Sequence, residues 1–348
     1  MNDVRIAVIG SGLVGRRHVD AIAAATGATL AAIVEPVPEG REYAAGRGVP
    51  WFGDLGSLID ARVCDAAILA TPTPLHADQA MSCIEAGVPV LIEKPIADAS
   101  AAARVIVEAS EAAGVPIAVG HHRRHNPIIA FAKDTIEEGT LGSVRAVQAT
   151  CWLRKPDGYF AEAPWRTKRG AGPISVNLVH DIDLLRYLVG EVAEVRAQAA
   201  PSARGHENED VAAAVLSFAN GAVGTISVSD AIAAPWSWEH TAGEYPVYPR
   251  TSESCYLIGG TRGSLSVPDL TLWRHEEDAG WWSPITATRS PRASVDPLVA
   301  QVEQFASVVR GEVEPLVSGR EGLRTLEVIE AIQRSAGTGE VVSLEKPR

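Results

Sequence analysis

A glycine-rich turn near the start of the chain constrains its fold more than any other feature. The segment Gly10-Ser11-Gly12-Leu13-Val14-Gly15 follows a short apolar run at residues 5–9 and precedes a helical pattern at residues 13–25. Strand, glycine turn and helix in this order form a phosphate cradle, because glycine permits a tight turn and close backbone approach, and the helix N-terminus offers N–H groups. We therefore predict that this segment binds the pyrophosphate of a dinucleotide.

An acidic residue further along indicates which dinucleotide is bound. The next predicted strand, at residues 29–34, is followed by Glu35. A carboxylate about 20 residues past the turn accepts hydrogen bonds from the adenosine ribose hydroxyls and repels a ribose phosphate. The sequence thus favours NAD over NADP. The prolines at 36 and 38, together with Arg41, leave NADP as the alternative.

The pattern of elements predicts an α/β chain in two parts. Apolar runs at 5–9, 29–34, 66–70, 88–92 and 116–119 alternate with helical patterns, which is typical of a doubly wound parallel sheet. Longer alternating stretches follow at 144–152, 194–200, 211–218 and 222–229, with helices expected at 126–138, 174–189, 296–310 and 320–335. We predict a Rossmann domain at 1–122 and an α+β domain with a large, mostly antiparallel sheet at 123–348. The aromatic segment 231–252 is expected to be a long loop that lines a site or packs on a neighbouring subunit.

Composition excludes several classes of protein. The formal net charge of −12 disfavours nucleic-acid and anionic-membrane partners. The four cysteines, Cys64, Cys83, Cys151 and Cys255, form no CxxC pair, so we expect reduced thiols and no metal site. The first strand begins within a few residues of the N-terminus and no apolar run approaches the length of a membrane span. We expect a cytoplasmic protein.

A second motif, Glu93-Lys94-Pro95, follows a later apolar strand. Open α/β sheets bind ligands at the carboxyl ends of their strands, so Lys94 is expected beside the nicotinamide. Moving a hydride from a carbinol requires a group that takes the hydroxyl proton. The usual lysine pKa of about 10.4 falls toward neutrality next to the nicotinamide cation and on partial burial. Lys94 is therefore the candidate catalytic residue, against the alternative of a surface lysine, and Glu93 is expected to pin the turn through hydrogen bonds.

Four motifs together carry a family resemblance. They are the glycine turn, the segment Ala70-Thr71-Pro72-Thr73-Pro74-Leu75-His76, the Glu93-Lys94-Pro95 motif, and His180-Asp181-Ile182-Asp183 after Gly170-Ala171-Gly172. With these motifs the chain resembles the glucose-fructose oxidoreductase and myo-inositol dehydrogenase (Gfo/Idh/MocA) family along almost its whole length. The resemblance implies an open-faced second sheet that forms homodimers or homotetramers, and NAD(P)-dependent oxidation or reduction of sugars, polyols and related cyclic alcohols. It also adds Thr71, Pro72 and His76 to the expected cofactor site.

The resemblance further assigns roles around His180. In the family the matching histidine shares acid and base duty with the lysine, and the matching aspartate, here Asp183, holds the local geometry. Spacing of three puts His180 and Asp183 on one helix face. Many members carry an aspartate four residues before the histidine, where this chain has Val176. Asn177 is expected to hydrogen-bond a substrate hydroxyl or the nicotinamide amide; the alternative for His180 is a core or capping residue.

The substrate pocket is expected to draw on two segments. The candidate residues are His121, His122 and Arg124 after the last Rossmann strand, and Tyr159, Trp165 and Arg166 before the His180 helix. Two arginines at one site favour a carboxylate or a polyhydroxylated ring, because guanidinium donates in a fixed fork; the alternative for each is an ordinary ion pair. The run His206-Glu207-Asn208-Glu209-Asp210 is predicted to be a turn and not a metal site.

Three functions remain open at this point. The first is hydride transfer between a nicotinamide and a hydroxyl or carbonyl of a sugar, inositol, sugar acid or related cyclic diol. The second is a lyase or glycoside-cleaving enzyme that oxidises its substrate only transiently and yields no net NADH. The third is a non-catalytic NAD-sensing binder, against which the presence of Lys94 and His180 argues.

Overall fold

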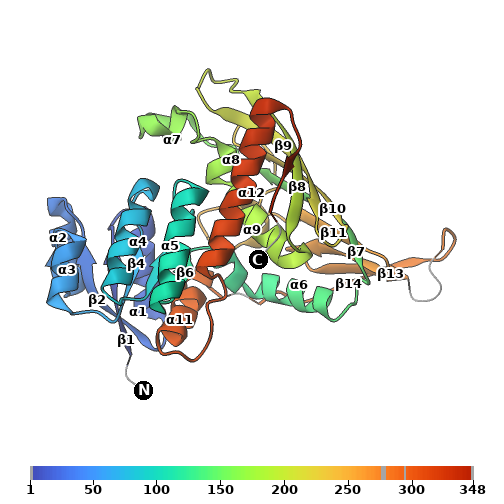
Figure 1. Cartoon of the computed structure of the whole chain (residues 1–348). Coiled ribbons are helices and arrows are strands. Elements are labelled where there is room, and N and C mark those ends of the chain that lie inside the picture. Colours follow the sequence, from blue (N-terminus) through green and yellow to red (C-terminus); the bar gives the residue numbers. More distant parts are fainter. Residues whose placement is uncertain (1–2, 276–279, 294, 346–348) are drawn as a thin grey trace. The chain divides into compact units, whose positions relative to one another are not determined.

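The computed structural model describes residues 3–275, 280–293 and 295–345 (Figure 1). The chain divides into two compact units, which we describe separately. The first comprises Met1–Asn126 and Val295–Leu326, and the second comprises Pro127–Ser294 and Glu327–Arg348. This division differs from the boundary expected at residue 122, because residues 295–326 return to the first unit.

The first unit contains a six-stranded sheet in the order β3-β2-β1-β4-β5-β6, and every pair of neighbours is parallel. The strands are β1 (Val4–Ile9), β2 (Ala28–Val34), β3 (Trp51–Phe52), β4 (Ala66–Leu69), β5 (Val90–Ile92) and β6 (Ile117–Val119). The strand order reverses between β1 and β4, which is the topological switch point where such sheets bind ligands. The predicted Rossmann-type sheet is confirmed, and only the two-residue β3 was not expected.

Helices cover both faces of this sheet. They are α1 (Leu13–Ala24), α2 (Pro38–Arg47), α3 (Leu55–Ala61), α4 (His76–Glu85), α5 (Ser100–Ala113) and α11 (Pro297–Val309), with short 3₁₀ turns η1 (Thr73–Leu75) and η2 (His122–His125). Successive residues of β1 alternate between the two cores: Ile6 and Val8 lie with α1 and α11, whereas Ala7 and Ile9 lie with α3, α4 and α5. Burial on both faces explains why the strands are continuous apolar runs.

Helix α11 accounts for the difference in the domain boundary. Its residues Leu298, Val302 and Phe305 repeat at helical spacing and are buried in the same core as β1. Asp296 caps the helix by accepting a hydrogen bond from the N–H of Leu298 at 2.9 Å. The helix was correctly predicted, but its assignment to the second domain was wrong, because tertiary packing rather than chain order decides which core an amphipathic helix joins.

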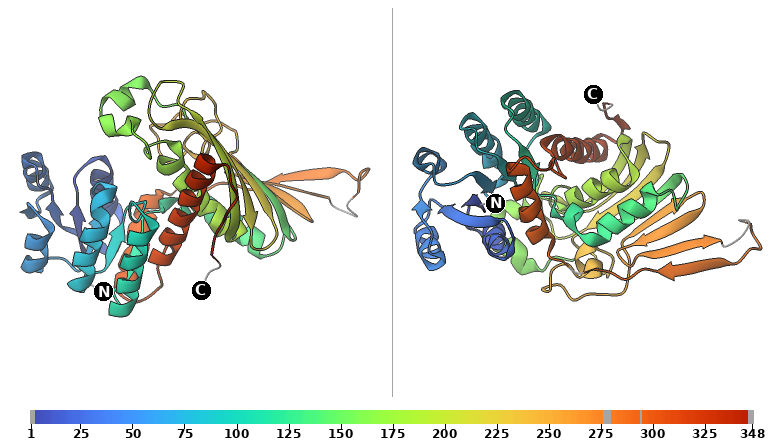
Figure 2. Two further views of the ribbon diagram at one scale, coloured as in Figure 1. Left: turned by 45° about the horizontal axis from the view of Figure 1, so that its top comes forward. Right: turned by 90° about the horizontal axis from the view of Figure 1, so that it is seen from below.

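Among the described residues, the second unit contains a nine-stranded sheet in the order β14-β13-β12-β11-β7-β10-β9-β8-β15. Figure 2 gives two further views of the ribbon. The strands are β7 (Val144–Trp152), β8 (Val192–Pro201), β9 (Glu209–Phe218), β10 (Val223–Ser229), β11 (Tyr256–Gly260), β12 (Gly263–Val267), β13 (Thr271–His275), β14 (Ile285–Arg289) and β15 (Val342–Ser343). The sheet is mostly antiparallel, as predicted. Strands β7 and β10 are parallel neighbours, so that Trp152 and Ser229 end side by side at one edge.

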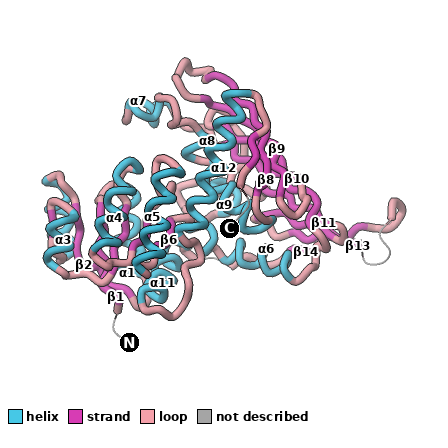
Figure 3. Tube along the Cα trace, viewed as in Figure 1, coloured by secondary structure: helices cyan, strands magenta, loops and turns pink. Residues whose placement is uncertain are grey.

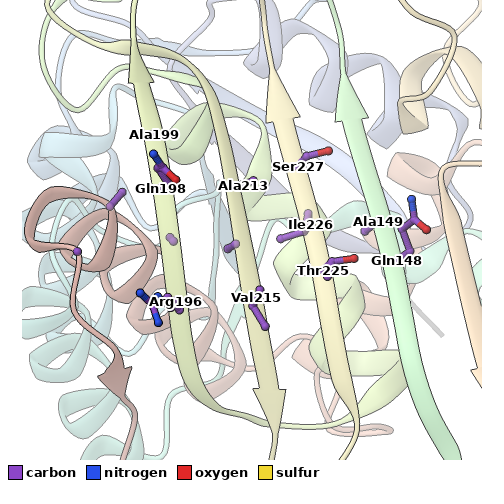
Figure 4. Close-up of a pocket in the computed structure, with 14 residues that line it drawn as sticks. Gln148, Ala149, Arg196, Gln198, Ala199, Ala213, Val215, Thr225, Ile226 and Ser227 are labelled. Atoms are coloured by element: carbon purple, nitrogen blue, oxygen red, sulfur yellow. The ribbon is translucent and has the colours of Figure 1, made fainter.

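One face of this sheet is covered by helices and the other is open. The helical segments are α6 (Pro127–Glu137), α7 (Asp157–Ala161), η3 (Pro164–Thr167), α8 (Pro173–Val176), α9 (Leu178–Val189), α10 (Trp238–Ala242) and α12 (Gly319–Thr338) (Figure 3). The first residues of α12, up to Leu326, belong to the first unit. Residues of α6, α9 and the second part of α12 share one core with alternate sheet residues such as Val147 and Leu216. The alternate residues Gln148, Arg196, Val215 and Thr225 are exposed on the other face and line a hollow of about 660 Å³ (Figure 4).

Two expectations about the second unit need correction. The helix expected at 174–189 is two helices, α8 and α9, separated at Asn177, where β-branched residues and asparagine lower the helix propensity. The expected loop 231–252 contains α10, which Ser237 caps by accepting from the N–H of His240. In the described part of the chain, all four cysteines are free and none of the helices is both long and apolar enough to cross a membrane.

Candidate active site

The glycine turn between β1 and α1 has the shape that a pyrophosphate needs. Gly10 has φ of +93°, and a Cβ there would lie 2.6 Å from the carbonyl oxygen of Ala70. A Cβ on Gly15 would lie 1.9 Å from the carbonyl oxygen of Gly10, so helix and turn approach too closely for any other residue. A Cβ on Gly12, in contrast, would meet nothing within 4 Å, and no side chain of the described residues caps α1. The open glycine and uncapped helix end fit a dinucleotide phosphate group.

Glu35 lies against this turn. It directly follows β2, and its carboxylate accepts hydrogen bonds from the N–H of Ser11 at 2.7 Å and from its hydroxyl at 3.1 Å. A Cβ at Gly40 would lie 2.3 Å from the Cβ of Glu35, so glycine leaves room for the acidic side chain. A negative charge fixed beside the cradle disfavours a ribose phosphate.

The turn after β4 is tied to the lysine motif by His76. The side chain of His76 is buried, with Nδ1 2.9 Å from the carbonyl oxygen of Pro95 and Nε2 2.9 Å from that of Thr71. The Thr71 hydroxyl donates to Oε1 of Gln79 at 2.6 Å, and Pro72 is exposed. His76 therefore bridges the ends of β4 and β5, and it supports the turn that carries Lys94.

Lys94 follows the end of β5 and is held by its neighbour Glu93. The buried Glu93 carboxylate accepts a hydrogen bond from the N–H of Lys94 at 3.1 Å, and its other oxygen lies 2.7 Å from Nε2 of His18. Burial by itself would raise the pKa of Glu93. The hydrogen bond from His18 and the charges of His18, Lys94 and His122 outweigh burial and lower that pKa to about 2. Glu93 is an anion at every pH near neutrality.

The segment after β6 is more buried than a surface loop. His121 and Arg124 have relative exposures of 1% and 3%, and His122 is partly exposed. The Arg124 guanidinium forms an ion pair with Glu321, at 2.7 Å from Nη2 to Oε2. The ion pair therefore occupies part of the Arg124 guanidinium, which the sequence predicts to bind the substrate.

In the second unit, the segment between β7 and α8 forms a cluster of aromatic and cationic side chains. The Arg166 guanidinium carbon lies 4.0 Å from the ring centroid of Tyr159, and its Nη1 donates to the Tyr159 carbonyl oxygen at 2.6 Å. Trp165 is 58% exposed. Lys155, which was not singled out from the sequence, lies 5.0 Å from the same Tyr159 ring. Two cations therefore flank one tyrosine.

Lys155 belongs to a buried ionic cluster at the paired ends of β7 and β10. Its Nζ lies 3.7 Å from a carboxylate oxygen of Asp230, which also receives a hydrogen bond from Arg204 at 2.9 Å. Burial lowers the pKa of Lys155, and the negative charge of Asp230 opposes that effect. The sequence around Lys155 does not indicate that this lysine is buried, because its partners Arg204 and Asp230 lie 49 and 75 positions further along the chain.

Helix α9 carries the histidine motif in a buried setting. His180 is 8% exposed, Asp183 is 1% exposed, and Asp181 accepts a hydrogen bond from the hydroxyl of Tyr256. Asn177 lies at the start of α9, and its side-chain oxygen is buried with no hydrogen-bond partner in the described part of the chain. A buried acceptor without a donor is costly, so this oxygen is suited to a ligand hydroxyl or amide. No group of three or more histidine, cysteine or acidic side chains among the described residues is arranged to hold a metal.

Comparisons with known proteins agree with this geometry. Residues 4–121 match the family model described as the oxidoreductase family with NAD-binding Rossmann fold, and residues 129–266 match the GFO/IDH/MocA C-terminal domain. The WlbA dehydrogenase of Bordetella pertussis, solved with NADH and UDP-GlcNAcA, is 30% identical with a TM-score of 0.81; the match covers 99% of this chain and 100% of that one. The chain belongs to the Gfo/Idh/MocA family. Its first unit is an NAD-binding domain, and the protein is an oxidoreductase that acts on hydroxyl groups.

Two curated members of the family extend the comparison. Inositol 2-dehydrogenase 2 of Saccharopolyspora erythraea is 29% identical over 98% of this chain and 96% of its own length. The rhizopine catabolism protein MocA of Rhizobium meliloti is 29% identical, but that match spans only 55% of this chain and 59% of MocA. The names of these two relatives refer to different compounds, rhizopine and inositol.

Proposed function

We propose that the protein transfers a hydride between NAD and a hydroxyl or carbonyl group of a sugar, inositol, sugar acid or related cyclic diol. The observation that carries this proposal is the placement of Lys94. It follows β5 at the carboxyl edge of the same sheet whose β1 and α1 form the dinucleotide cradle, and Glu93 fixes its backbone. An amine at that edge is suited to proton transfer next to a bound dinucleotide.

The roles of the chain's own residues follow from their chemistry. NAD, when bound at Gly10 to Gly15, supplies the hydride acceptor. Lys94 takes the proton from the substrate hydroxyl in oxidation and returns it in reduction. We assign His180 a share in this proton transfer from its motif position, and Asp183 the task of holding the histidine's helix geometry. Val176 cannot ionise, so these roles involve no carboxylate four residues before the histidine.

Substrate recognition is assigned to side chains that offer hydrogen bonds and an aromatic surface. In the second unit these are Asn177, with its unpartnered side-chain oxygen, the stacked Tyr159 and Arg166, and the exposed Trp165. Aromatic rings and fixed guanidinium groups suit the apolar faces and hydroxyls of sugars. In the first unit we retain His121, His122 and Arg124 as candidates, with Arg124 acting from its ion pair with Glu321.

A substrate panel tests the proposed function. Purified protein is incubated with NAD or NADP and with sugars, inositols, sugar acids or cyclic diols, and reduced nicotinamide is followed by absorbance while products are analysed by chromatography. We expect stoichiometric NADH with at least one member of the panel. Product formation without net NADH would support the lyase alternative instead, and NAD binding without any product from a wide panel would support the NAD-sensing binder.

We also propose that the open face of the second sheet joins copies of the chain as a homodimer or homotetramer. Val215, Val223 and Leu257 are 45%, 50% and 52% exposed on its strands, and apolar side chains grouped on one open face favour association. Sedimentation velocity of Val215→Glu should show smaller species than the wild type. The matched control is Val105→Glu at a similarly exposed site of the first unit, and an unchanged oligomer in Val215→Glu would contradict the proposal.

A further inference from the structure

A histidine of the first helix is buried against the lysine motif. His18 lies on α1, three residues after Gly15, and is completely buried, at 0% exposure. Its Nε2 lies 2.7 Å from Oε1 of Glu93 at the end of β5. Because an ionised carboxylate can only accept, the Nε2–H of His18 donates to Glu93. This contact joins the helix of the dinucleotide cradle to the residue that precedes Lys94.

The Glu93 carboxylate is confined to one position. One oxygen accepts from His18 and the other accepts from the backbone N–H of Lys94 at 3.1 Å. On the side of β6, a Cβ at Gly120 would lie 2.9 Å from the carboxyl carbon of Glu93, so the backbone there approaches as closely as glycine allows. The carboxylate is therefore held between α1 and the end of β6 while it accepts from the backbone N–H of Lys94.

The confined carboxylate is also a charge beside Lys94. The groups that act on Glu93 are His18 from α1, Lys94 from its own turn and His122 from η2. Each of them lowers the pKa of Glu93, which holds the group ionised. An anion at this place in turn favours the ammonium form of Lys94, because opposite charges stabilise each other most strongly where water is excluded.

We propose that His18 and Glu93 form a positioning pair that sets the orientation and the proton affinity of Lys94 from the helix that carries the dinucleotide cradle. This inference rests on the proposed role of Lys94 in proton transfer. Neither residue is proposed to touch the reacting atoms. Glu93 acts through the Lys94 peptide and through its charge, and His18 acts by holding Glu93.

Chemical labelling of Lys94 tests the charge effect without any substrate. The NAD-loaded protein is labelled briefly with an amine-acylating reagent across a pH series, and the modified Lys94 peptide is quantified by mass spectrometry. Glu93→Gln keeps the shape and one acceptor oxygen, replaces the other oxygen with an NH2 group and removes the charge, and should lower the apparent pKa of Lys94 by about one unit. Glu85→Gln, at an exposed glutamate of α4, is the matched control and should leave the profile unchanged. An unchanged profile in Glu93→Gln would overturn the inference even if the enzyme turns over a panel substrate.

Variants of His18 test the positioning effect. His18→Leu removes the donor, and His18→Gln retains an N–H that can reach a carboxylate. With a panel substrate, kcat should fall by about ten-fold or more in His18→Leu and by less in His18→Gln, while the affinity for NADH, read by fluorescence, stays within about three-fold in both. Equal kcat in wild type and both variants would show that His18 only fills the core. If His18→Leu does not fold, His18→Ala, which also lacks the donor, takes its place in the labelling assay, and an unchanged Lys94 profile in that variant would contradict the positioning role of His18.

Discussion

The buried Glu93 carboxylate should make a measurable contribution to stability that depends on pH. Its pKa in the folded protein is about 2, against an ordinary value of 4.5. Each unit of difference is worth about 1.4 kcal/mol, so the ionised group stabilises the first unit by on the order of 3 kcal/mol near neutral pH. A pKa lowered by folding gives stability that is full above the unfolded value and lost as pH falls toward the folded value. About 2 kcal/mol of it should disappear between pH 6 and pH 3.

The substitution that tests this is Glu93→Gln, measured by urea unfolding with the exposed Glu85→Gln as control. The wild type should exceed Glu93→Gln by about 3 kcal/mol near pH 7, with the gap narrowing to about 1 kcal/mol near pH 3. A gap of the same size at both pH values would mean that the amide is a poor fit for the site and that charge is irrelevant. Equal stability at neutral pH would refute the reasoning outright.

Three further outcomes follow from the geometry. Glu35→Ser should narrow the preference for NAD over NADP by about ten-fold, measured as the ratio of the two dissociation constants, and a wild type that prefers NADP would contradict the role of Glu35. Gly15→Ala should abolish NADH binding, because its Cβ would lie 1.9 Å from a backbone oxygen, whereas Gly46→Ala, where nothing lies within 4 Å, should bind normally. Combining His180→Ala with Lys94→Ala should reduce turnover little more than either single change, and strictly additive losses would show that the two residues do not share one proton transfer.

Much of the first unit could be predicted because its signals are local. The glycine turn and the apolar strands around it each lie within a few residues, and the structure differs at their ends by one or two residues only. The second sheet was predicted only in part. Strands β11 to β15 are short and rich in glycine, serine and threonine, so they show little apolar alternation. Helix α11 joined the first unit through packing that chain order does not reveal.

The candidate site also combines residues that local motifs indicate with residues that only folding brings together. Lys94 and the glycine cradle belong to motifs, so the sequence alone predicts their part in the site. His18 and Glu93 are 75 residues apart, and the partners of Lys155 come from other strands and loops, so only folding brings these charges together. The sequence holds one hint that the His18 side chain points into the fold. His18 follows Gly15 by three residues and lies on the same face of α1 as the buried Val19 and Ile22.

The most direct test of the account is turnover by Lys94→Ala on the substrate that the panel identifies. Loss of the proton-transferring amine should lower kcat by about 10²–10⁴-fold while the dissociation constant for NADH stays within a few-fold of the wild type. Lys168→Ala, at an exposed lysine of the second unit, serves as the matched control and should turn over normally. Near-normal turnover by Lys94→Ala would contradict the central claim that this lysine carries the proton in NAD-dependent oxidation of a hydroxyl group.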